Sequence, residues 1–237
     1  PDPPPAGHSS LAAIPQPSIL ILTPLKNAAR FLPVFFDNLL QLDYPREKLS
    51  LAFLESDSED GTWNILQTQI EEHEKDFARI ASFRQKFGFK FEGPRWQPHL
   101  QFQRRAILGQ ARTTLFKRAW QGEEWVLWID ADVVSYPRDA LDQLLATGKA
   151  IVVPHCVRFP AGPTFDLNTF KFKPGGQPQE WRHLIDGNIQ TPRGQGRLYL
   201  DDLRGQGLVE IDGVGGTMLL VKAEVHAQGI LFPHYSY

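Results

Sequence analysis

The segment that most constrains the fold is a short apolar run that ends in two carboxylates. Residues 125–129, Trp-Val-Leu-Trp-Ile, are aromatic, branched or aliphatic, and Asp130 and Asp132 follow them closely. A run of this length and composition predicts a strand that is buried on both faces. Such strands form the centre of open α/β sheets, whose ligands bind at the carboxyl ends of the strands. We therefore expect an α/β fold with a site at Asp130 and Asp132.

The spacing of the two aspartates indicates a metal site. In an extended segment, residues two apart point to the same side, so Asp130 and Asp132 could approach one cation. Hard divalent cations prefer oxygen ligands and often share them with phosphate groups. The alternative is a strand-end turn with two solvated aspartates, because tripeptides with two carboxylates are common.

The composition is that of a single folded domain. With 237 residues, 42% of them hydrophobic, the chain can bury a sizeable core. The net charge of −2 provides no global field that would favour a nucleic-acid partner. The single cysteine, Cys156, excludes an intrachain disulfide and a cysteine-cluster zinc site. No apolar run reaches the ~18–20 residues of a membrane span, so none is expected in this chain.

The first part of the chain predicts a βαβ unit of the nucleotide-binding type. The apolar runs Ser18–Thr23 and Leu49–Leu54 are typical of buried strands, and a helical pattern lies between them. Asn27 is the expected cap of that helix, and Pro33 is expected in its first turn. A carboxylate in the acidic loop 55–62, after the second strand, could accept hydrogen bonds from ribose hydroxyls. A capped, solvated turn explains this loop equally well.

The remaining elements are expected to follow in alternating order after a flexible, proline-rich lead-in over residues 1–17. Residues 158–207 lose their periodicity, and a stretch of this length without strong elements is usually functional or mobile. The other predicted elements are a helix ending near Phe77, a strand over 83–91, a helix over 96–120, a helix over 139–146, a strand over 150–153, two strands joined by a glycine hinge over 208–221, and a helix over 222–228.

Two further groups of residues are candidates for the site. In the helix 96–120, Arg105 and Arg112 are seven residues apart and share a face, and guanidinium groups pair well with phosphate oxygens. For either arginine alone, a place on a solvated basic face is the commoner explanation. In the glycine hinge, Glu210 and Asp212 would lie on one side of an extended segment that can approach a ligand closely. A bulge or hairpin corner would also explain these glycines.

Several short motifs occur together in one order and carry a family resemblance. The chain resembles glycosyltransferase family 62, the family of the fungal mannan-polymerase subunits, over about residues 18–233. The motifs that carry this resemblance are Ile19–Ala28, Asp43–Pro45, Arg104–Arg112, Trp125–Val133, Glu210–Gly216, Val221–His226 and Phe232–Pro233.

The resemblance implies a GT-A fold, which is a single Rossmann-like nucleotide-binding domain with a mostly parallel central sheet. It implies GDP-mannose as donor, Mn²⁺ or Mg²⁺ on the donor's diphosphate, a glycan or other hydroxyl acceptor, and transfer with retention of the α configuration. Residues 18–134 would bind the nucleotide sugar and the metal, and residues 135–237 would bind the acceptor. A homo- or hetero-oligomer would fit such an enzyme.

The resemblance also implies roles on the donor side of the site. Either Glu55 or Asp57 would meet the base or ribose. Arg105 and Arg112 would lie near phosphate or support the metal loop. The residues expected to line the nucleoside pocket come from the loop after the first strand, namely Thr23, Pro24, Leu25 and Asn27.

On the metal and acceptor side, Asp130 and Asp132 would hold the cation. Relatives commonly supply a third ligand from a histidine beyond the Phe-Pro motif. Here His234 or His155 could take that role, or the enzyme is shorter or truncated. Glu210 and Asp212 would stand near the transferred sugar or the acceptor hydroxyl, and together with Arg112 they are the catalytic candidates. An inverting enzyme would use Asp212 as its base.

Other functions are compatible with the same residues. The chain could be a non-catalytic nucleotide-binding or scaffolding subunit, or an inverting transferase that uses another nucleotide sugar. A metal-dependent phosphohydrolase is less favoured, because two-metal sites need more ligands than cluster here. A single cysteine and no visible signal favour a cytoplasmic protein. The fungal relatives would instead place it in the Golgi lumen, behind an amino-terminal anchor that has been removed.

Overall fold

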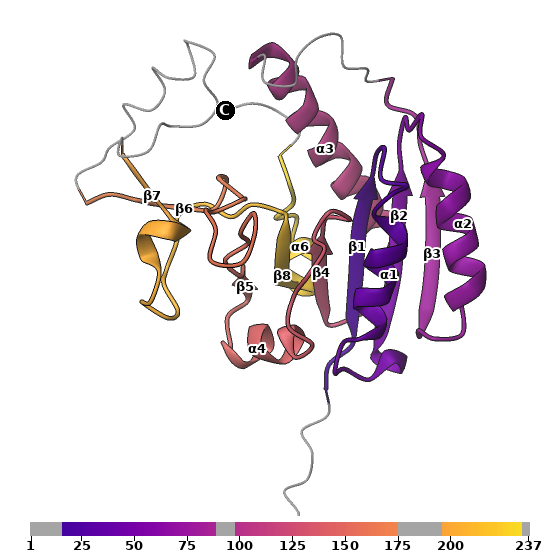
Figure 1. Cartoon of the computed structure of the whole chain (residues 1–237), viewed down its shortest axis with the longest axis horizontal. Coiled ribbons are helices and arrows are strands. Elements are labelled where there is room, and N and C mark those ends of the chain that lie inside the picture. The colour runs from indigo at the N-terminus through magenta and orange to yellow at the C-terminus, as the bar shows by residue number, and fades with distance from the viewer. Residues whose placement is uncertain (1–15, 89–97, 175–195, 234–237) are drawn as a thin grey trace, which may run out of the picture.

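A six-stranded sheet organises the part of the chain that the computed structural model describes, residues 16–88, 98–174 and 196–233. The strands lie in the order β3-β2-β1-β4-β8-β5 (Figure 1). Their bounds are β1 Ile19–Leu25, β2 Leu49–Glu55, β3 Arg79–Arg84, β4 Trp125–Ile129, β5 Ile151–Val152 and β8 Met218–Lys222.

Four neighbouring strands of this sheet are parallel. β1 pairs in parallel with both β2 and β4, and β2 pairs in parallel with β3. β8 runs antiparallel to β4, and β5 runs antiparallel to β8. The sheet is therefore mostly parallel, as predicted, and the carboxyl ends of β1, β2 and β4 meet at one edge.

Helices cover both faces of the sheet. Side chains of α1, α2 and α4 pack in one core, and those of α3 and α6 pack in the other. A small antiparallel sheet of β6 and β7 lies on the β5 side of the main sheet (Figure 1). The bounds are α1 Leu32–Leu40, α2 Thr62–His73, α3 Pro98–Ala119, α4 Ala140–Ala146, α6 Ala223–Ala227, β6 Phe170–Phe172 and β7 Arg197–Tyr199, with short 3-10 helices at Arg46–Lys48 and Leu200–Leu203.

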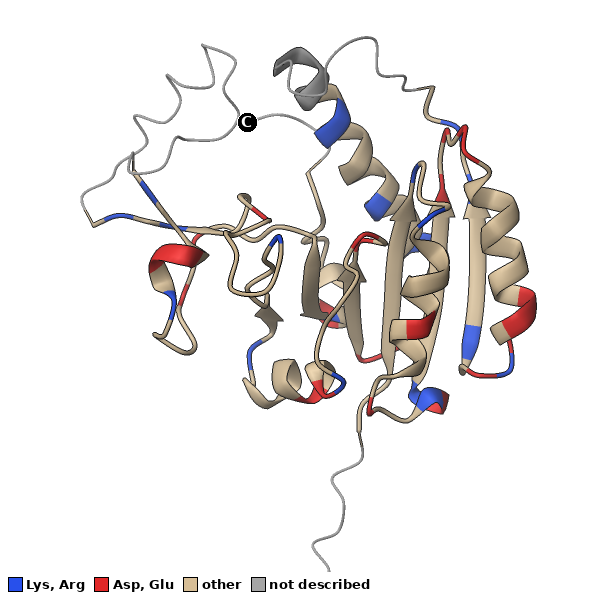
Figure 2. Ribbon diagram, in the orientation of Figure 1, with Lys and Arg blue, Asp and Glu red and all other residues tan. Residues whose placement is uncertain are grey.

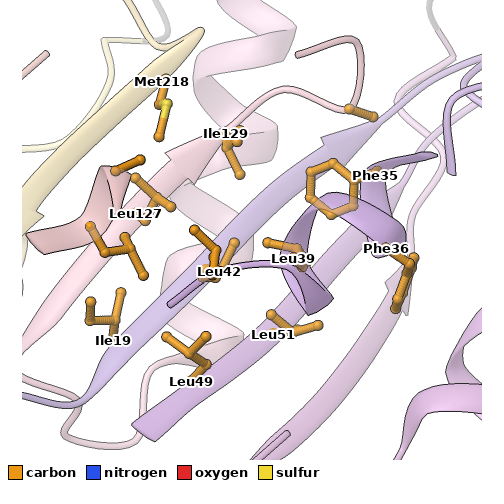
Figure 3. Packing of buried hydrophobic residues seen from close by; sticks show 14 of the residues in the cluster. Ile19, Phe35, Phe36, Leu39, Leu42, Leu49, Leu51, Leu127, Ile129 and Met218 are labelled. Carbon is orange, nitrogen blue, oxygen red and sulfur yellow. The ribbon is translucent and has the colours of Figure 1, made fainter. Parts of the chain in front are cut away.

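The two cores explain why β1 is almost continuously apolar. Ile19 and Ile21 belong to the core with α1, whereas Leu20 and Leu22 belong to the core with α3. Figure 3 shows the first core, in which Ile19 lies with Leu49 of the neighbouring strand. Burial of one such side chain stabilises a fold by ~1.5–3 kcal/mol. A strand with a core on each face leaves few positions for polar side chains.

The third predicted strand lies earlier than expected. β3 spans Arg79–Arg84, whereas the predicted range was 83–91, of which residues 89–91 lie outside the described part of the chain. The register with β2 runs from Ser50 opposite Arg79 to Glu55 opposite Arg84. Because β2 ends at Glu55, the last hydrogen bond to it comes from the Gln85 N–H, directly after Arg84.

The cap predicted for the first helix was wrong. Phe31 is the N-cap of α1, and Pro33 lies in the first turn as predicted. Asn27 instead adopts a left-handed backbone conformation with φ of 51°, and its side-chain oxygen accepts a hydrogen bond from the Glu59 N–H. The next helix, α2, ends at His73 and does not reach Phe77.

In the last part of the chain, β8 and α6 confirm two of the predicted elements. Residues 208–212 form a loop and not the predicted strand, and Gly213 makes only an isolated bridge to Phe170. β5 is shorter than predicted, and Ile151 in it is 42% exposed. Residues 1–15 of the predicted lead-in lie outside the described residues. None of the described helices combines the length and apolarity that a bilayer crossing requires.

Candidate functional site

A cavity of about 200 Å³ opens where the carboxyl ends of β1, β2 and β4 meet α3. Its walls come from the loops after these three strands and from one face of the helix. In Figure 2, the acidic residues after β2 and the basic residues in the first half of α3 lie at this same end of the sheet. Six predicted site residues line the cavity, namely Pro24, Leu25, Asn27, Asp57, Asp130 and Asp132.

The loop after β1 is pinned to the acidic loop after β2. The Asn27 N–H donates to Ser58 Oγ at 3.0 Å, and the Ala28 N–H donates to Thr62 Oγ1 at 2.8 Å. Asn27 and Asp57 both have a φ of 51°, a conformation that costs free energy for residues other than glycine. The hydrogen bonds between the loops hold both residues in it. The cavity wall is therefore built as one connected unit.

Asp60 contributes to the same connection. Its carboxylate accepts hydrogen bonds from the N–H groups of Ala29 and Thr62 at 3.1 and 3.0 Å. Partial burial acts to raise the pKa of Asp60, but the hydrogen bonds from Thr62 and Ala29 outweigh it and lower the pKa. Asp60 therefore stays ionised and holds the acidic loop against the loop after β1.

Of the two acidic residues considered for base or ribose, Asp57 lines the cavity and Glu55 does not. Glu55 is 1% exposed, and its oxygens accept hydrogen bonds from Arg84 Nε at 2.7 Å and from the Ser58 N–H at 2.9 Å. Asp57 also accepts a hydrogen bond from the Phe87 N–H at 3.0 Å. Glu55 thus has a structural ion pair, whereas Asp57 lies at the cavity.

Thr23 also differs from its expected place. Its side chain is fully buried in β1 and does not line the cavity. The Thr23 hydroxyl has no hydrogen-bond partner within the described ranges. Only Pro24, Leu25 and Asn27 of this predicted group face the cavity, and Lys26 joins them.

Asp130 is held by Arg112 of α3. The Arg112 Nη2 donates to Asp130 Oδ1 at 2.9 Å and to the Gly216 carbonyl at 3.0 Å. The Arg112 side chain is 7% exposed, and that of Asp130 is 31% exposed. Burial raises the pKa of Asp130 to about 6, an effect that Arg112 opposes and the charges of Asp132 and Asp166 reinforce. Arg112 therefore supports the loop that carries the two aspartates and does not line the cavity itself.

The two aspartates are the metal-binding candidates that share the cavity. Within residues 16–88, 98–174 and 196–233, no group of three or more His, Cys, Asp or Glu side chains is arranged to hold a metal ion. His155 is engaged elsewhere, because its Nε2 lies 2.9 Å from Thr164 Oγ1 and 3.3 Å from an oxygen of Asp201. The other candidate, His234, lies outside the described residues.

The arginine of α3 that lines the cavity is Arg104 and not Arg105. Arg104 shares a helix face with Ile107, Leu108 and Ala111, which also line the cavity. Arg105 lies on the next face and is partly buried. Burial and repulsion from Arg104 and Arg197 lower the pKa of Arg105. The attraction to Asp166 acts in the opposite direction but does not outweigh them.

The backbone of the glycine hinge, residues 213–216, approaches the site closely. A Cβ atom on Gly215 would lie 1.7 Å from Asp166 Oδ2, and one on Gly216 would lie 2.2 Å from Arg112 Nη1. Only glycine permits these contacts. Asp166 was missed in the sequence because it lies in the stretch without periodicity. It is 9% exposed, and its charge contributes to raising the pKa of Asp130.

Glu210 and Asp212 do not reach the cavity. Both are exposed, and Asp212 Oδ2 accepts a hydrogen bond from the Phe172 N–H at 2.7 Å. This bond ties the loop before the glycine hinge to β6. The sequence placed the two carboxylates on an extended strand, but the segment is a loop and the expectation of a shared strand face does not hold.

Comparison with known proteins identifies a family over most of the chain. The Anp1 family model matches residues 7–236. The chain is 31% identical to the mannan polymerase II complex anp1 subunit of Schizosaccharomyces pombe, over 94% of this chain and 57% of that protein. It is 32% identical to the ANP1 subunit of the same complex in Saccharomyces cerevisiae, over 92% of this chain and 48% of that protein. The chain thus spans about half the length of these relatives.

A solved structure supports the fold. TarS from S. aureus in complex with UDP matches with a TM-score of 0.51 and 13% identity, over 92% of this chain and 50% of that chain. The architecture is the GT-A glycosyltransferase fold, as predicted. The resemblance to the fungal mannan-polymerase subunits is likewise confirmed. The chain belongs to the Anp1 family.

Proposed function

We propose that this chain is the catalytic domain of a metal-dependent mannosyltransferase that moves mannose from GDP-mannose to a glycan. The observation that carries the proposal is the pair Asp130 and Asp132 on the wall of a cavity at the carboxyl ends of three parallel strands. Two relatives named as mannan polymerase subunits support mannose as the sugar. We assign acceptor binding to residues 135–237.

The residues present fit a hard divalent cation such as Mn²⁺. Asp130 and Asp132 both offer carboxylate oxygens to the cavity, and Arg112 orients Asp130 from behind, as outer partners of metal ligands commonly do. When bound, the cation would act as a Lewis acid that offsets charge on the departing diphosphate. Arg104 and Lys26, on the cavity walls, add positive charge for the same phosphates.

The cavity also provides a place for the nucleoside. Pro24, Leu25, Phe31 and Leu108 form apolar wall, and Asp57 supplies a carboxylate beside it. Apolar walls with a few polar groups are typical of small-molecule sites. Its volume of about 200 Å³ is below the ~300–1,000 Å³ of typical ligand pockets, which suits the nucleoside part of the donor with the sugar outside.

We infer transfer with retention of the α configuration. A retaining transferase of this kind needs no dedicated protein base, because a donor phosphate oxygen can accept the proton of the acceptor hydroxyl. The carboxylate of Asp212, the base that an inverting enzyme would use, is engaged by the Phe172 N–H at 2.7 Å. Anomeric analysis of the product by NMR tests this step, and a β-linked product from the α-linked donor would rule it out.

Thermal unfolding with GDP, UDP, GDP-mannose or UDP-sugars, each with Mn²⁺ or EDTA, tests the donor and metal assignment. We expect GDP and GDP-mannose to stabilise the protein only with Mn²⁺, by about 2.7 kcal/mol at 100 times the Kd. Asp130→Asn combined with Asp132→Asn should abolish the shift. Asp37→Asn, at an exposed position on α1, is the matched control and should keep it.

The outcomes separate the candidate functions. Stabilisation by GDP with Mn²⁺ but no transfer to any mannose-containing acceptor would favour a non-catalytic nucleotide-binding subunit. A thermal shift with UDP and not with GDP would mean that the donor is a UDP-sugar and not GDP-mannose. No metal-dependent shift with any nucleotide would reject the assignment of Asp130 and Asp132.

A further inference from the structure

Arg112 is a buried cation whose hydrogen bonds satisfy only part of its guanidinium. Its Nη2 donates to Asp130 and to the Gly216 carbonyl. Its Nε is buried and has no hydrogen-bond partner among the described residues. Burial of a charge costs free energy unless the charge is compensated. Asp130 supplies one negative charge near Arg112. A metal ion bound to Asp130 would share this carboxylate with Arg112. Another contact should therefore hold Arg112 in place.

Two aromatic rings provide that contact. The Arg112 Cζ lies 4.7 Å from the centroid of the Phe232 ring and 6.0 Å from that of Trp128. Cations within ~6 Å of a ring centroid are attracted by the face of the ring. The two rings also contact each other edge to face, with centroids 5.1 Å apart. Phe232 is thus the nearer of two rings that surround the guanidinium.

His226 of α6 anchors this arrangement. The Trp128 Nε1–H donates to His226 Nε2 at 2.9 Å, and His226 Nδ1 lies 2.7 Å from the Ile230 carbonyl. These partners require a proton on Nδ1 and none on Nε2, which is a neutral imidazole. Burial, which lowers the pKa of His226, favours the same form. The bond to Ile230 fixes the chain two residues before Phe232.

We propose that Phe232 is a positioning residue for the metal site. Its ring holds the Arg112 guanidinium against Asp130, and Arg112 in turn keeps the Asp130 carboxylate directed to the cavity. Phe232 does not line the cavity, so it acts on the site through Arg112. The inference rests on the proposed function, because it takes Asp130 as a metal ligand.

The test compares two phenylalanines that differ in the arginine they contact. Phe232 and Phe83 are both partly buried and pack against the same core. The Phe83 ring lies 5.9 Å from the Cζ of Arg118, on the same helix as Arg112. Phe232→Leu is the test variant, Phe83→Leu is the matched control, and Phe232→Tyr is the conservative rescue.

Two readouts are measured on the whole chain. The first is the Arg112 Nε–H signal in NMR spectra of ¹⁵N-arginine-labelled protein, assigned through Arg112→Lys. It needs neither metal nor turnover. The second is the Kd of Mn²⁺ in the presence of GDP. We expect Phe232→Leu to shift the Arg112 signal and to weaken Mn²⁺ about 10-fold, the lower end of the effect of removing an outer partner of a metal ligand.

Phe83→Leu and Phe232→Tyr should leave both readouts near those of the wild type. An unchanged Arg112 signal in Phe232→Leu, or an equal loss of Mn²⁺ affinity in Phe83→Leu, would overturn the positioning role. If the wild type binds no Mn²⁺ with GDP, the proposed function fails and the metal role of Phe232 fails with it. The Arg112 signal then still shows whether the ring holds the guanidinium, so the two failures can be told apart.

Discussion

At the scale of single residues, three arginines hold carboxylates at the ends of strands. Each pair combines an ion pair with a hydrogen bond to or from a backbone group, so loss of one partner leaves a buried group without compensation. The pairs serve different purposes, because two of them tie the sheet together and the third orients a residue of the site. They are Arg84 with Glu55, Arg79 with Glu123, and Arg112 with Asp130.

Glu123 allows a test of such a pair away from the site. Burial acts to raise its pKa, but hydrogen bonds from the Gln121 N–H and Arg79 outweigh this and lower it. The pair therefore stabilises the fold above the ordinary pKa of 4.5, and this contribution is lost as the pH falls through the folded-state pKa. We expect Glu123→Gln to cost about 1–3 kcal/mol at neutral pH, measured by urea unfolding.

The difference between Glu123→Gln and the wild type should shrink below pH 4.5. Glu74→Gln, at an exposed position, should change stability little at any pH. A difference that does not depend on pH would show that the ionisation of Glu123 plays no part.

His226 makes stability depend on pH near neutrality. Its pKa is lowered by burial, so the unfolded state binds more protons than the folded state as the pH falls through 6.5. The stabilisation from the neutral imidazole is present above pH 6.5 and is lost progressively below it. Urea unfolding of His226→Phe from neutral pH to about pH 5 should show a flatter profile than the wild type. If the stability of His226→Phe depended on pH as steeply as that of the wild type, the titrating group would be a residue other than His226.

At the scale of elements, the site is formed where loops from several strands meet. β1, β2 and β4 each contribute the loop at their carboxyl end, and α3 closes the cavity from the side. The glycine hinge before β8 approaches from behind and carries the carbonyl that accepts a hydrogen bond from Arg112. The hinge therefore affects the site through backbone position and not through a side chain of its own.

Gly216→Ala should show this dependence. The added Cβ would lie 2.2 Å from Arg112 Nη1, so the guanidinium or the hinge must move. We expect a loss of stability of about 1–3 kcal/mol in urea unfolding, the usual cost of overpacking, together with weaker Mn²⁺ binding. Val214→Ala, in the same hinge at a position 41% exposed, is the control and should have a small effect. Wild-type stability in Gly216→Ala would contradict the close contact.

At the scale of the whole molecule, the central sheet and the region around β6 and β7 differ in burial. Every residue of β2 is buried, as are all residues of β1 except Pro24. In β6 and β7 only Tyr199 is buried, and the ladder joins three residues on each strand. Regions with few buried apolar contacts open at lower free energy than the core.

Hydrogen exchange measured by mass spectrometry should follow this division. We expect amides of β1, β2 and β4 to exchange slowest, at rates that approach those of global unfolding. Amides of β6, β7 and the two-residue strand β5 should exchange faster by local opening. Equal protection of β6 and β1 would mean that the two regions unfold as one unit.

Three central strands of the sheet, and the position of the candidate site at their carboxyl ends, could be predicted from the sequence. β1, β2 and β4 could be predicted because a strand between two cores must be apolar at nearly every position. Asp130 and Asp132 come after the last of these runs, so their place at the carboxyl edge follows from strand direction alone. Two motifs of the family resemblance, Ile19–Ala28 and Trp125–Val133, lie on β1 and β4 and the loops that follow them.

Which polar side chains reach the cavity depends on contacts that exist only in the folded chain. Arg104 lines the cavity in place of Arg105 because of the rotation of α3 against the sheet. Sequence periodicity shows which residues share a helix face, but it does not show what that face contacts. Glu55 forms an ion pair with Arg84, and the two residues come together only when β2 and β3 pair. Asp166 reaches Gly215 from a stretch without periodicity. Such contacts join residues far apart in the chain, and local sequence patterns carry no information about them.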